Sequence, residues 1–213
     1  PARMTAPAPW GEGVRRLRDD PAFGPWVERA GPVGDIVSDL PPFEYLVRAI
    51  VYQQLAGAAA RTIHGRVVEV LDGPVTPAAV GAADPVALRG AGLSAAKLKA
   101  ILDLAAKSGD GTHDLAPAAL HALDDEAVVA RLTRVWGVGR WTAEMFLMFR
   151  LGRPDVWPVG DLGVRSGWTR IHALAERPDA GQLEHAAEHL RPWRSAAAWY
   201  CWRALEFSDD DTP

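Results

Sequence analysis

One stretch constrains this chain more than any other, namely residues 132–167, LTRVWGVGRWTAEMFLMFRLGRPDVWPVGDLGVRSG. Its apolar residues follow helical spacing up to Gly137, and a second apolar helical pattern runs from Trp141 to Phe149. Glycine adopts backbone angles that side chains forbid, so the Gly-Val-Gly turn can reverse the chain within three residues. The sequence therefore predicts two helices joined by a very tight turn.

The tight turn also predicts a place for an anion. The amides of Gly137, Gly139 and Arg140 would lie at the N-terminus of the second helix. Amides there have no intrahelical acceptor, and the helix dipole favours a phosphate. The alternative is an ordinary helical hairpin within the core, and the turn taken alone favours that alternative.

A stiff loop follows the hairpin and ends at Asp161. Pro154, Pro158 and Gly160 restrict the loop, and the segment LGVRSGWTRIHAL after Asp161 reads as a further helix. Local sequence alone favours Asp161 as the N-cap of that helix, because its carboxylate can accept hydrogen bonds from free amides. A catalytic carboxylate could occupy the same position, and the two roles are compatible.

Composition narrows the class of protein. The 213 residues are 48% hydrophobic and include nine tryptophans, which indicates a globular chain with one domain or two small lobes. No apolar run approaches the ~20 residues of a membrane span, and the first residues lack the apolar core of a signal peptide. The single cysteine, Cys201, excludes an internal disulfide, a multi-cysteine metal site and a four-cysteine iron–sulfur cluster, and fits a reducing, intracellular compartment.

The charge is unevenly distributed. The net charge of −4 is unusual for a nucleic-acid-binding protein. Residues 131–170, however, contain seven arginines against three acidic residues, a local charge of +4, which leaves −8 on the rest, partly in the tail 209–211. A basic face on an acidic body suits salt-sensitive DNA binding, whereas scattered solvated arginines are the alternative.

Helical periodicity continues through the chain, and no segment alternates like a strand over a convincing length, so we expect an all-α fold. The longest pattern, residues 43–71, breaks near Gly57, and Gln53-Gln54-Leu55 ends its first helix. Ser94 is the expected N-cap of a helix carrying Lys97 and Lys99. A solvated helix face is the favoured interpretation of these lysines.

The hairpin GVGRWTAEMF, the loop VWPVGDLGVRSG and the later PWRS segment with Trp202 resemble the helix-hairpin-helix superfamily of DNA base-excision glycosylases. The resemblance is greatest to its alkylated-base branch, the 3-methyladenine DNA glycosylase II type, and covers about residues 42–207. It implies two helical lobes with a cleft between them. Residues 1–42 would join the C-terminal lobe, 43–155 would form a central lobe ending in the hairpin 132–150, and 156–213 would carry the catalytic aspartate.

The resemblance also implies roles for individual residues. Asp161 is the expected catalytic residue, and the expected walls of the base pocket are Trp141, Trp202, Met145 and Tyr52. The expected DNA contacts are Gly137, Val138, Gly139, Arg140, Thr142, Gln54, Leu55, Ser94 and Lys97. By this match Gln54, or else Leu55, fills the gap left by an extruded nucleotide; a polar helix end with Leu55 buried is the alternative. His64 could line the same face, although a satisfied surface histidine is favoured.

The implied chemistry is the removal of an alkylated base. Extruding a base costs a few kcal/mol, and stacking on tryptophan returns ~1–3 kcal/mol per base. A cationic base such as 3-methyladenine or 7-methylguanine leaves without a general acid. Asp161 would stabilise the oxocarbenium-like sugar and orient or deprotonate the attacking water.

The chain departs from the strand-cutting members of the superfamily, which carry a lysine just after the hairpin glycines. Trp141 stands at that position, and no lysine follows Lys107, so we expect an abasic product and no lyase step. Some relatives have tyrosine where this chain has Met145, which leaves the substrate range open. We expect no required cofactor and no metal, although carbonyls of the turn could hold a monovalent cation.

The expected partner is double-stranded DNA containing alkylated bases. We expect the protein to act as a monomer and not to bind a membrane. The expected location is the cytoplasm, at the nucleoid, in a prokaryote or the nucleus in a eukaryote. Three rivals stand beside this interpretation: a glycosylase for oxidised or mismatched bases, a non-catalytic DNA-binding module and a helical scaffold protein.

Overall fold

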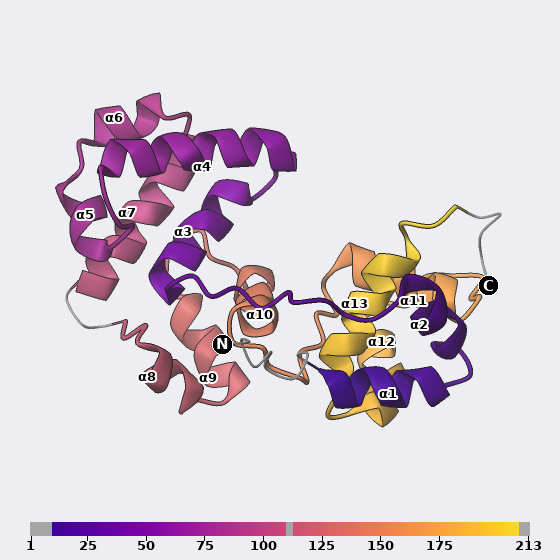
Figure 1. Cartoon of the computed structure of the whole chain (residues 1–213). Coiled ribbons are helices and arrows are strands. Elements are labelled where there is room, and N and C mark those ends of the chain that lie inside the picture. Colours follow the sequence, from indigo (N-terminus) through magenta and orange to yellow (C-terminus); the bar gives the residue numbers. More distant parts are fainter. Residues whose placement is uncertain (1–9, 110–112, 209–213) are drawn as a thin grey trace, which may run out of the picture. The chain divides into compact units, whose positions relative to one another are not determined.

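The computed structural model describes residues 10–109 and 113–208, and every regular element in these residues is a helix (Figure 1). The expected all-α class is therefore confirmed. The acidic tail 209–211 lies outside the described residues. None of the described helices is long and apolar enough to cross a membrane.

The chain forms two compact units. The central unit comprises Ser38–Phe146, and the terminal unit comprises Pro1–Val37 together with Leu147–Pro213. The sequence predicts boundaries after residues 42 and 155. The second boundary falls earlier because the end of the hairpin helix packs into the terminal unit, where the Phe149 ring lies 6.2 Å from that of Trp10 and 5.9 Å from that of Trp202.

The central unit is built from α3 to α9 and the greater part of α10. The bounds of these helices are α3 Pro42–Tyr52, α4 Gly57–Leu71, α5 Pro77–Ala82, α6 Pro85–Gly90, α7 Ala95–Gly109, α8 Pro117–His121, α9 Asp125–Leu132 and α10 Arg140–Phe149. The long pattern 43–71 is thus two helices, separated near Gly57 as expected.

Apolar stripes join these helices into one core. Helix α7 packs against α3, α5 and α6, and Ile101 and Leu104 on α7 are fully buried with Leu46 and Ile50 on α3. Burial of such side chains removes apolar surface from water, which is the main force holding the helices together. The core of the central unit therefore fixes α3 and α7, the two helices that support the hairpin.

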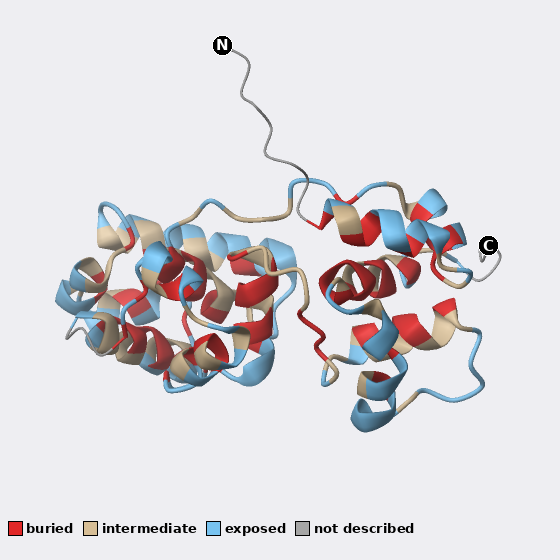
Figure 2. Cartoon of the chain, turned by 90° about the horizontal axis from the view of Figure 1, so that it is seen from below, coloured by how far each residue is buried: buried red, intermediate tan, exposed pale blue. Residues whose placement is uncertain are grey.

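The terminal unit is arranged around α13, Arg194–Ala204, which packs against α1, α2 and α11. The other elements of this unit are α1 Gly11–Asp19, α2 Gly24–Ala30, α11 Leu162–Ile171, α12 Ala180–Ala186 and the short 3₁₀ helix η1 Glu188–Leu190. Most of α13 is buried, in contrast to the exposed outer faces of its neighbours (Figure 2).

Helices α11 and α13 lie in unusually close contact. A Cβ atom at Gly167 on α11 would lie 2.0 Å from the carbonyl oxygen of Cys201 on α13, so only glycine fits. This contact brings the N-terminal half of α11, and with it Asp161, next to the C-terminal half of α13.

Candidate active site and hairpin

The loop before α11 places Asp161 through two tight turns. The amide of Val159 donates to the carbonyl of Trp157, and the amide of Asp161 donates to that of Pro158, each at 2.9 Å. The Trp157 indole is buried, and its Nε1 donates to the carbonyl of Leu183 at 3.2 Å. The loop is therefore anchored by a buried side chain only four residues before the aspartate.

Asp161 is the N-cap of α11, and its Oδ1 accepts two hydrogen bonds. One comes from the Val164 amide at 2.8 Å and the other from Nε1 of Trp202 at 2.9 Å. Two donors on one oxygen fix the orientation of the carboxylate. The capping role expected from the local sequence is confirmed, and a half-buried, oriented carboxylate is also what a catalytic aspartate requires.

Trp202 reaches Asp161 because α11 lacks a side chain at Gly163. A Cβ there would lie 2.7 Å from Cδ1 of Trp202 and 3.0 Å from Oδ1 of Asp161. The indole also packs on the Phe149 ring, with the two ring centroids 5.9 Å apart and the planes at 37° to each other. Trp202 is therefore held both by packing and by its hydrogen bond to the carboxylate.

The hairpin has the expected tight turn between α9 and α10. Gly137 has φ of +79°, and a Cβ at this residue would lie 3.2 Å from Cβ of Ala100. Gly139 lies outside the left-handed region, so only one of the two glycines is needed for its backbone angle. Among the described residues, none accepts a hydrogen bond from the amides of Gly137, Gly139 or Arg140. These amides remain available for an anion.

Side chains from α3 and α7 support the turn. Gln53, the residue after α3, donates from Nε2 to the Gly137 carbonyl and to Oγ1 of Thr142, each at 3.2 Å. On α7, Asp103 accepts the Trp136 amide at 2.7 Å, and Lys107 donates to the Arg134 carbonyl at 2.8 Å. The sequence predicts neither the Gln53 contact nor the Asp103 contact, since nothing in their local sequence indicates a partner 84 or 33 residues away.

The lysines of α7 make contacts within the protein. Ser94 caps the helix, as expected, by accepting the Lys97 amide at 3.2 Å. Nζ of Lys97 donates to the Val51 carbonyl near the end of α3 at 2.7 Å, and burial lowers the pKa of this lysine. Nζ of Lys99 lies 4.3 Å from the centroid of the Trp136 ring. The interpretation as a simply solvated lysine face is therefore wrong for Lys97, and the contacts of Ser94 and Lys97 with DNA remain predictions.

The other predicted DNA-contacting residues lie near the hairpin and at the end of α3. Arg140 forms ion pairs with Glu126 and, at 3.1 Å, with Glu144, and these contacts raise its pKa. Gln54 is exposed with φ of +55°, and Leu55 is 38% exposed. The alternative in which Leu55 is buried is therefore wrong, and both residues project from the surface of the central unit.

The predicted base-pocket residues are divided between the two units. Trp141, 48% exposed, and the half-buried Met145 lie on α10, and Tyr52 lies at the end of α3, all in the central unit. The guanidinium of Arg48 lies 4.6 Å from the centroid of the Tyr52 ring, whose edge meets His64. Burial lowers the pKa of His64, and its Nε2 is buried without a partner among the described residues, so the satisfied surface histidine is not found.

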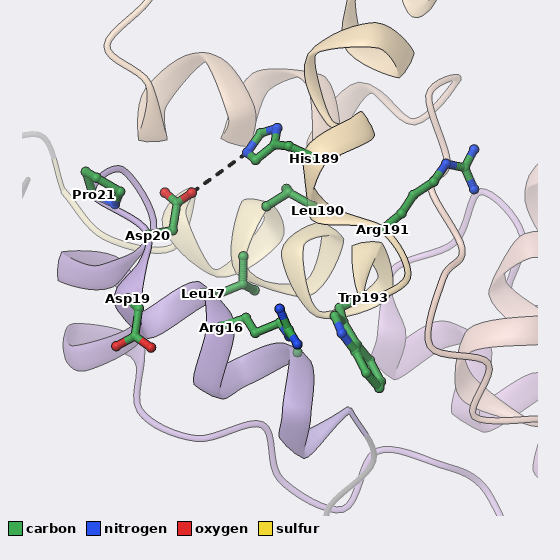
Figure 3. Close-up of a pocket in the computed structure, with 10 residues that line it drawn as sticks. Arg16, Leu17, Asp19, Asp20, Pro21, His189, Leu190, Arg191 and Trp193 are labelled. Atoms are coloured by element: carbon green, nitrogen blue, oxygen red, sulfur yellow. Dashed lines mark ion pairs between the residues drawn. The ribbon is translucent and has the colours of Figure 1, made fainter.

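A cavity of about 380 Å³ lies elsewhere in the terminal unit, between α1 and residues 189–193 (Figure 3). Asp20 and His189 face each other across it at 3.8 Å. Its lining contains none of the predicted site residues. Nor do the described residues contain a cluster of three or more His, Cys, Asp or Glu side chains that could hold a metal ion.

The tight hairpin and the capped aspartate on an all-helical fold define a helix-hairpin-helix protein. Residues 47–192 match the HhH-GPD superfamily of base excision DNA repair proteins, and the chain belongs to this family. It is 35% identical over 176 residues to DNA-3-methyladenine glycosylase 1 of Schizosaccharomyces pombe, a match that covers 81% of this chain and 76% of that one.

Two solved structures show the same fold. The S. pombe 3-methyladenine DNA glycosylase in complex with abasic DNA is 30% identical with a TM-score of 0.81, over 93% of this chain and 98% of that one. The DNA-3-methyladenine glycosidase of Bacillus halodurans is 32% identical with a TM-score of 0.83, over 93% of this chain and 91% of that one. The resemblance inferred from the sequence is thus confirmed.

Proposed function

We propose that the protein is a DNA glycosylase that extrudes alkylated bases of the 3-methyladenine and 7-methylguanine type and hydrolyses their N-glycosidic bond. The observation that carries this proposal is the double hydrogen bond on Oδ1 of Asp161, from the Val164 amide and the Trp202 indole. It supports an oriented carboxylate in contact with an aromatic side chain. The names of the similar glycosylases point to the same substrate class.

The carboxylate is suited to a reaction that needs one acidic group. A base alkylated at a ring nitrogen is cationic and leaves as a neutral molecule, so it requires no proton donor. As the bond to the base breaks, positive charge develops at the sugar carbon C1′ and its ring oxygen. Asp161 stabilises that charge and orients or deprotonates the water that completes the hydrolysis.

Base recognition is assigned to aromatic faces. The Trp202 indole, tied at its Nε1 edge to Asp161, presents a ring for stacking beside the carboxylate. Trp141 and Tyr52 are further aromatic candidates, with Met145 as an apolar neighbour on α10. Stacking of a cationic base on an indole face contributes up to ~2 kcal/mol. Because this amounts to only about 30-fold discrimination, the leaving ability of the base supplies the rest of the selectivity.

The hairpin is the proposed grip on the DNA backbone. The free amides of Gly137, Gly139 and Arg140 bind a phosphate, with Val138 and Thr142 as the neighbouring contact residues. Gln53 supports this geometry by holding the Gly137 carbonyl. That carbonyl still has a second lone pair, which a monovalent cation could use. Gln54, or else Leu55, fills the space of the extruded nucleotide.

The reaction ends at an abasic site. Strand cleavage in this superfamily requires a lysine that attacks the sugar, and Trp141 occupies that position here, with Lys107 as the last lysine of the chain. The proposed substrate is double-stranded DNA, and the proposed active species is a monomer. The corresponding site of action is the nucleoid of a prokaryote or the nucleus of a eukaryote.

Duplex DNA treated with a methylating agent tests the proposal. The protein should release 3-methyladenine or 7-methylguanine, identified by chromatography, and the DNA strand should break only after alkali is added. Release of oxidised or mismatched bases, and not of alkylated bases, would show that the protein is a glycosylase for a different substrate class. Salt-sensitive DNA binding without any base release would favour a non-catalytic module, and absence of DNA binding would favour a scaffold protein.

A further inference from the structure

A single buried serine holds the start of the loop that carries Asp161. Ser195, fully buried at the beginning of α13, donates from Oγ to the Arg153 carbonyl at 2.7 Å and accepts the Val156 amide at 2.9 Å. Its own amide donates to the Pro154 carbonyl at 3.0 Å. One residue thus forms hydrogen bonds with three of the four residues at which the loop begins.

The remaining residue of that segment, Asp155, is held by the neighbour of Ser195. Nε and Nη2 of Arg194 donate to Oδ1 and Oδ2 of Asp155 at 2.7 and 3.1 Å, and Nη1 donates to Glu184 at 2.8 Å. The Arg194 side chain is only 6% exposed. A bidentate pair of this kind specifies geometry, because the planar guanidinium fixes the direction of both hydrogen bonds to the carboxylate.

The same helix holds both ends of the loop. Ser195 and Trp202 are seven residues apart on α13, which is about two turns, so they lie on nearly the same face and ~10 Å apart. Ser195 binds residues 153–156, and Trp202 binds Asp161 itself. Only four residues separate Val156 from Asp161, and two turn hydrogen bonds lie within this segment. Because this segment is short and held by hydrogen bonds, a displacement of residues 153–156 should also displace the carboxylate of Asp161.

We propose that Ser195 is a positioning residue for Asp161, and that the Arg194–Asp155 pair secures it in that role. The inference rests on the proposed glycosylase function, in which Asp161 acts on the sugar. Displacing a reacting group by ~1 Å can lower a rate by ~100-fold. Ser195 does not touch the substrate in this proposal; it acts through the loop.

Ser195→Ala tests the proposal against a matched variant, Tyr200→Phe. Tyr200 is also fully buried on α13, and its hydroxyl donates to the Gly31 carbonyl at 3.0 Å, away from the loop. Both changes remove hydroxyl hydrogen bonds from the same helix. The single-turnover rate of base release should fall ~10- to 100-fold in Ser195→Ala and less than ~3-fold in Tyr200→Phe. The affinity of both for duplex DNA containing an abasic site should stay within ~3-fold of native.

A spectroscopic measurement provides a readout that needs no activity. The indole N–H of Trp202 can be assigned in a proton–nitrogen correlation spectrum through the signal lost in Trp202→Phe. Its hydrogen exchange should accelerate in Ser195→Ala, because the bond to Asp161 loosens, and should be unchanged in Tyr200→Phe. If Ser195→Ala does not fold, Asp155→Asn tests the same attachment of residues 153–156 to α13 by weakening the Arg194–Asp155 pair instead.

The outcomes separate the two proposals. A native protein that releases no base from any methylated duplex overturns the proposed function and the positioning role with it. An active native protein whose Ser195→Ala variant matches Tyr200→Phe in rate and in indole exchange overturns the positioning role alone. A selective loss of rate with accelerated Trp202 exchange supports it.

Discussion

Nε1 of Trp202 donates a 2.9 Å hydrogen bond to Oδ1 of Asp161, so the aromatic ring proposed to stack on the base and the proposed catalytic carboxylate form one unit. The Val164 amide binds the same oxygen at 2.8 Å. An indole can both stack through its face and donate through its edge, which phenylalanine cannot do. The geometry therefore couples base recognition to the orientation of the carboxylate.

Trp202→Phe should separate these two contributions. The variant keeps an aromatic ring but removes the hydrogen bond, which to a charged acceptor contributes about 1.5–3 kcal/mol. We expect single-turnover base release to fall at least ~10-fold. Binding to duplex DNA with an abasic site should change little in a gel-shift or anisotropy assay. A rate equal to that of the native protein would show that the hydrogen bond does not orient Asp161.

Gly163→Ala should disturb the same pair without removing either partner. Its Cβ would lie 2.7 Å from Cδ1 of Trp202, so the indole must move away from the carboxylate. We expect a loss of base-release rate comparable to that of Trp202→Phe.

Gly181→Ala is the control for Gly163→Ala, because Gly181 also lies in the first turn of a helix of the terminal unit and has no close neighbour other than its own N-cap, Asp179, at 3.5 Å. Equal activity of the two variants would contradict the tight packing of Trp202 on α11.

Gln53→Ala should weaken DNA binding without affecting the chemistry. The variant removes two hydrogen bonds that hold the hairpin, to the Gly137 carbonyl and to Oγ1 of Thr142. Each is worth about 0.5–1.5 kcal/mol, so we expect affinity for undamaged duplex to fall ~5- to 10-fold. Thr62→Ala, which removes a hydrogen bond within α4, should bind like the native protein. Native affinity of Gln53→Ala at every salt concentration would contradict the claim that Gln53 supports the DNA-binding geometry of the hairpin.

Cys201 should report on the packing of α13. It is fully buried, and burial, with a further contribution from the charge of Asp161, raises the pKa of its thiol well above the usual value. A thiol reagent should therefore react with the folded protein at pH 8 far more slowly than with the unfolded chain, because the thiolate is the reactive form. Absorbance of the released chromophore gives both rates. Rapid reaction in the native state would contradict the close packing of α11 on α13.

Features encoded by local sequence could be predicted. The helical periodicity, the Gly-Val-Gly turn and the caps at Ser94 and Asp161 all depend on residues within a few positions of one another. The structure confirms these features. The break near Gly57 followed from the same kind of pattern.

Contacts between distant segments could not be predicted. The hydrogen bond from the Val156 amide to Ser195 joins residues 39 positions apart, and the hydrogen bond from Gln53 to the Gly137 carbonyl joins residues 84 positions apart. Serine and glutamine are ordinary surface residues by composition, so only the packing of α13 and α3 reveals their partners. Lys97 shows the same limit: its sequence position suggested a solvated face, but the fold directs its ammonium to the Val51 carbonyl.

The rate of base release by Asp161→Asn tests the central claim most directly. Asparagine is an equally good N-cap and retains an oxygen for Val164 and Trp202, so the fold should be preserved while the negative charge is lost. Asp179→Asn is the matched control, because Asp179 caps α12 through a 2.8 Å bond to the Gln182 amide. On methylated duplex DNA under single-turnover conditions, we predict a loss of ~100-fold or more for Asp161→Asn and a native rate for Asp179→Asn. Comparable rates for Asp161→Asn and the native protein would contradict the assignment of Asp161 as the catalytic carboxylate.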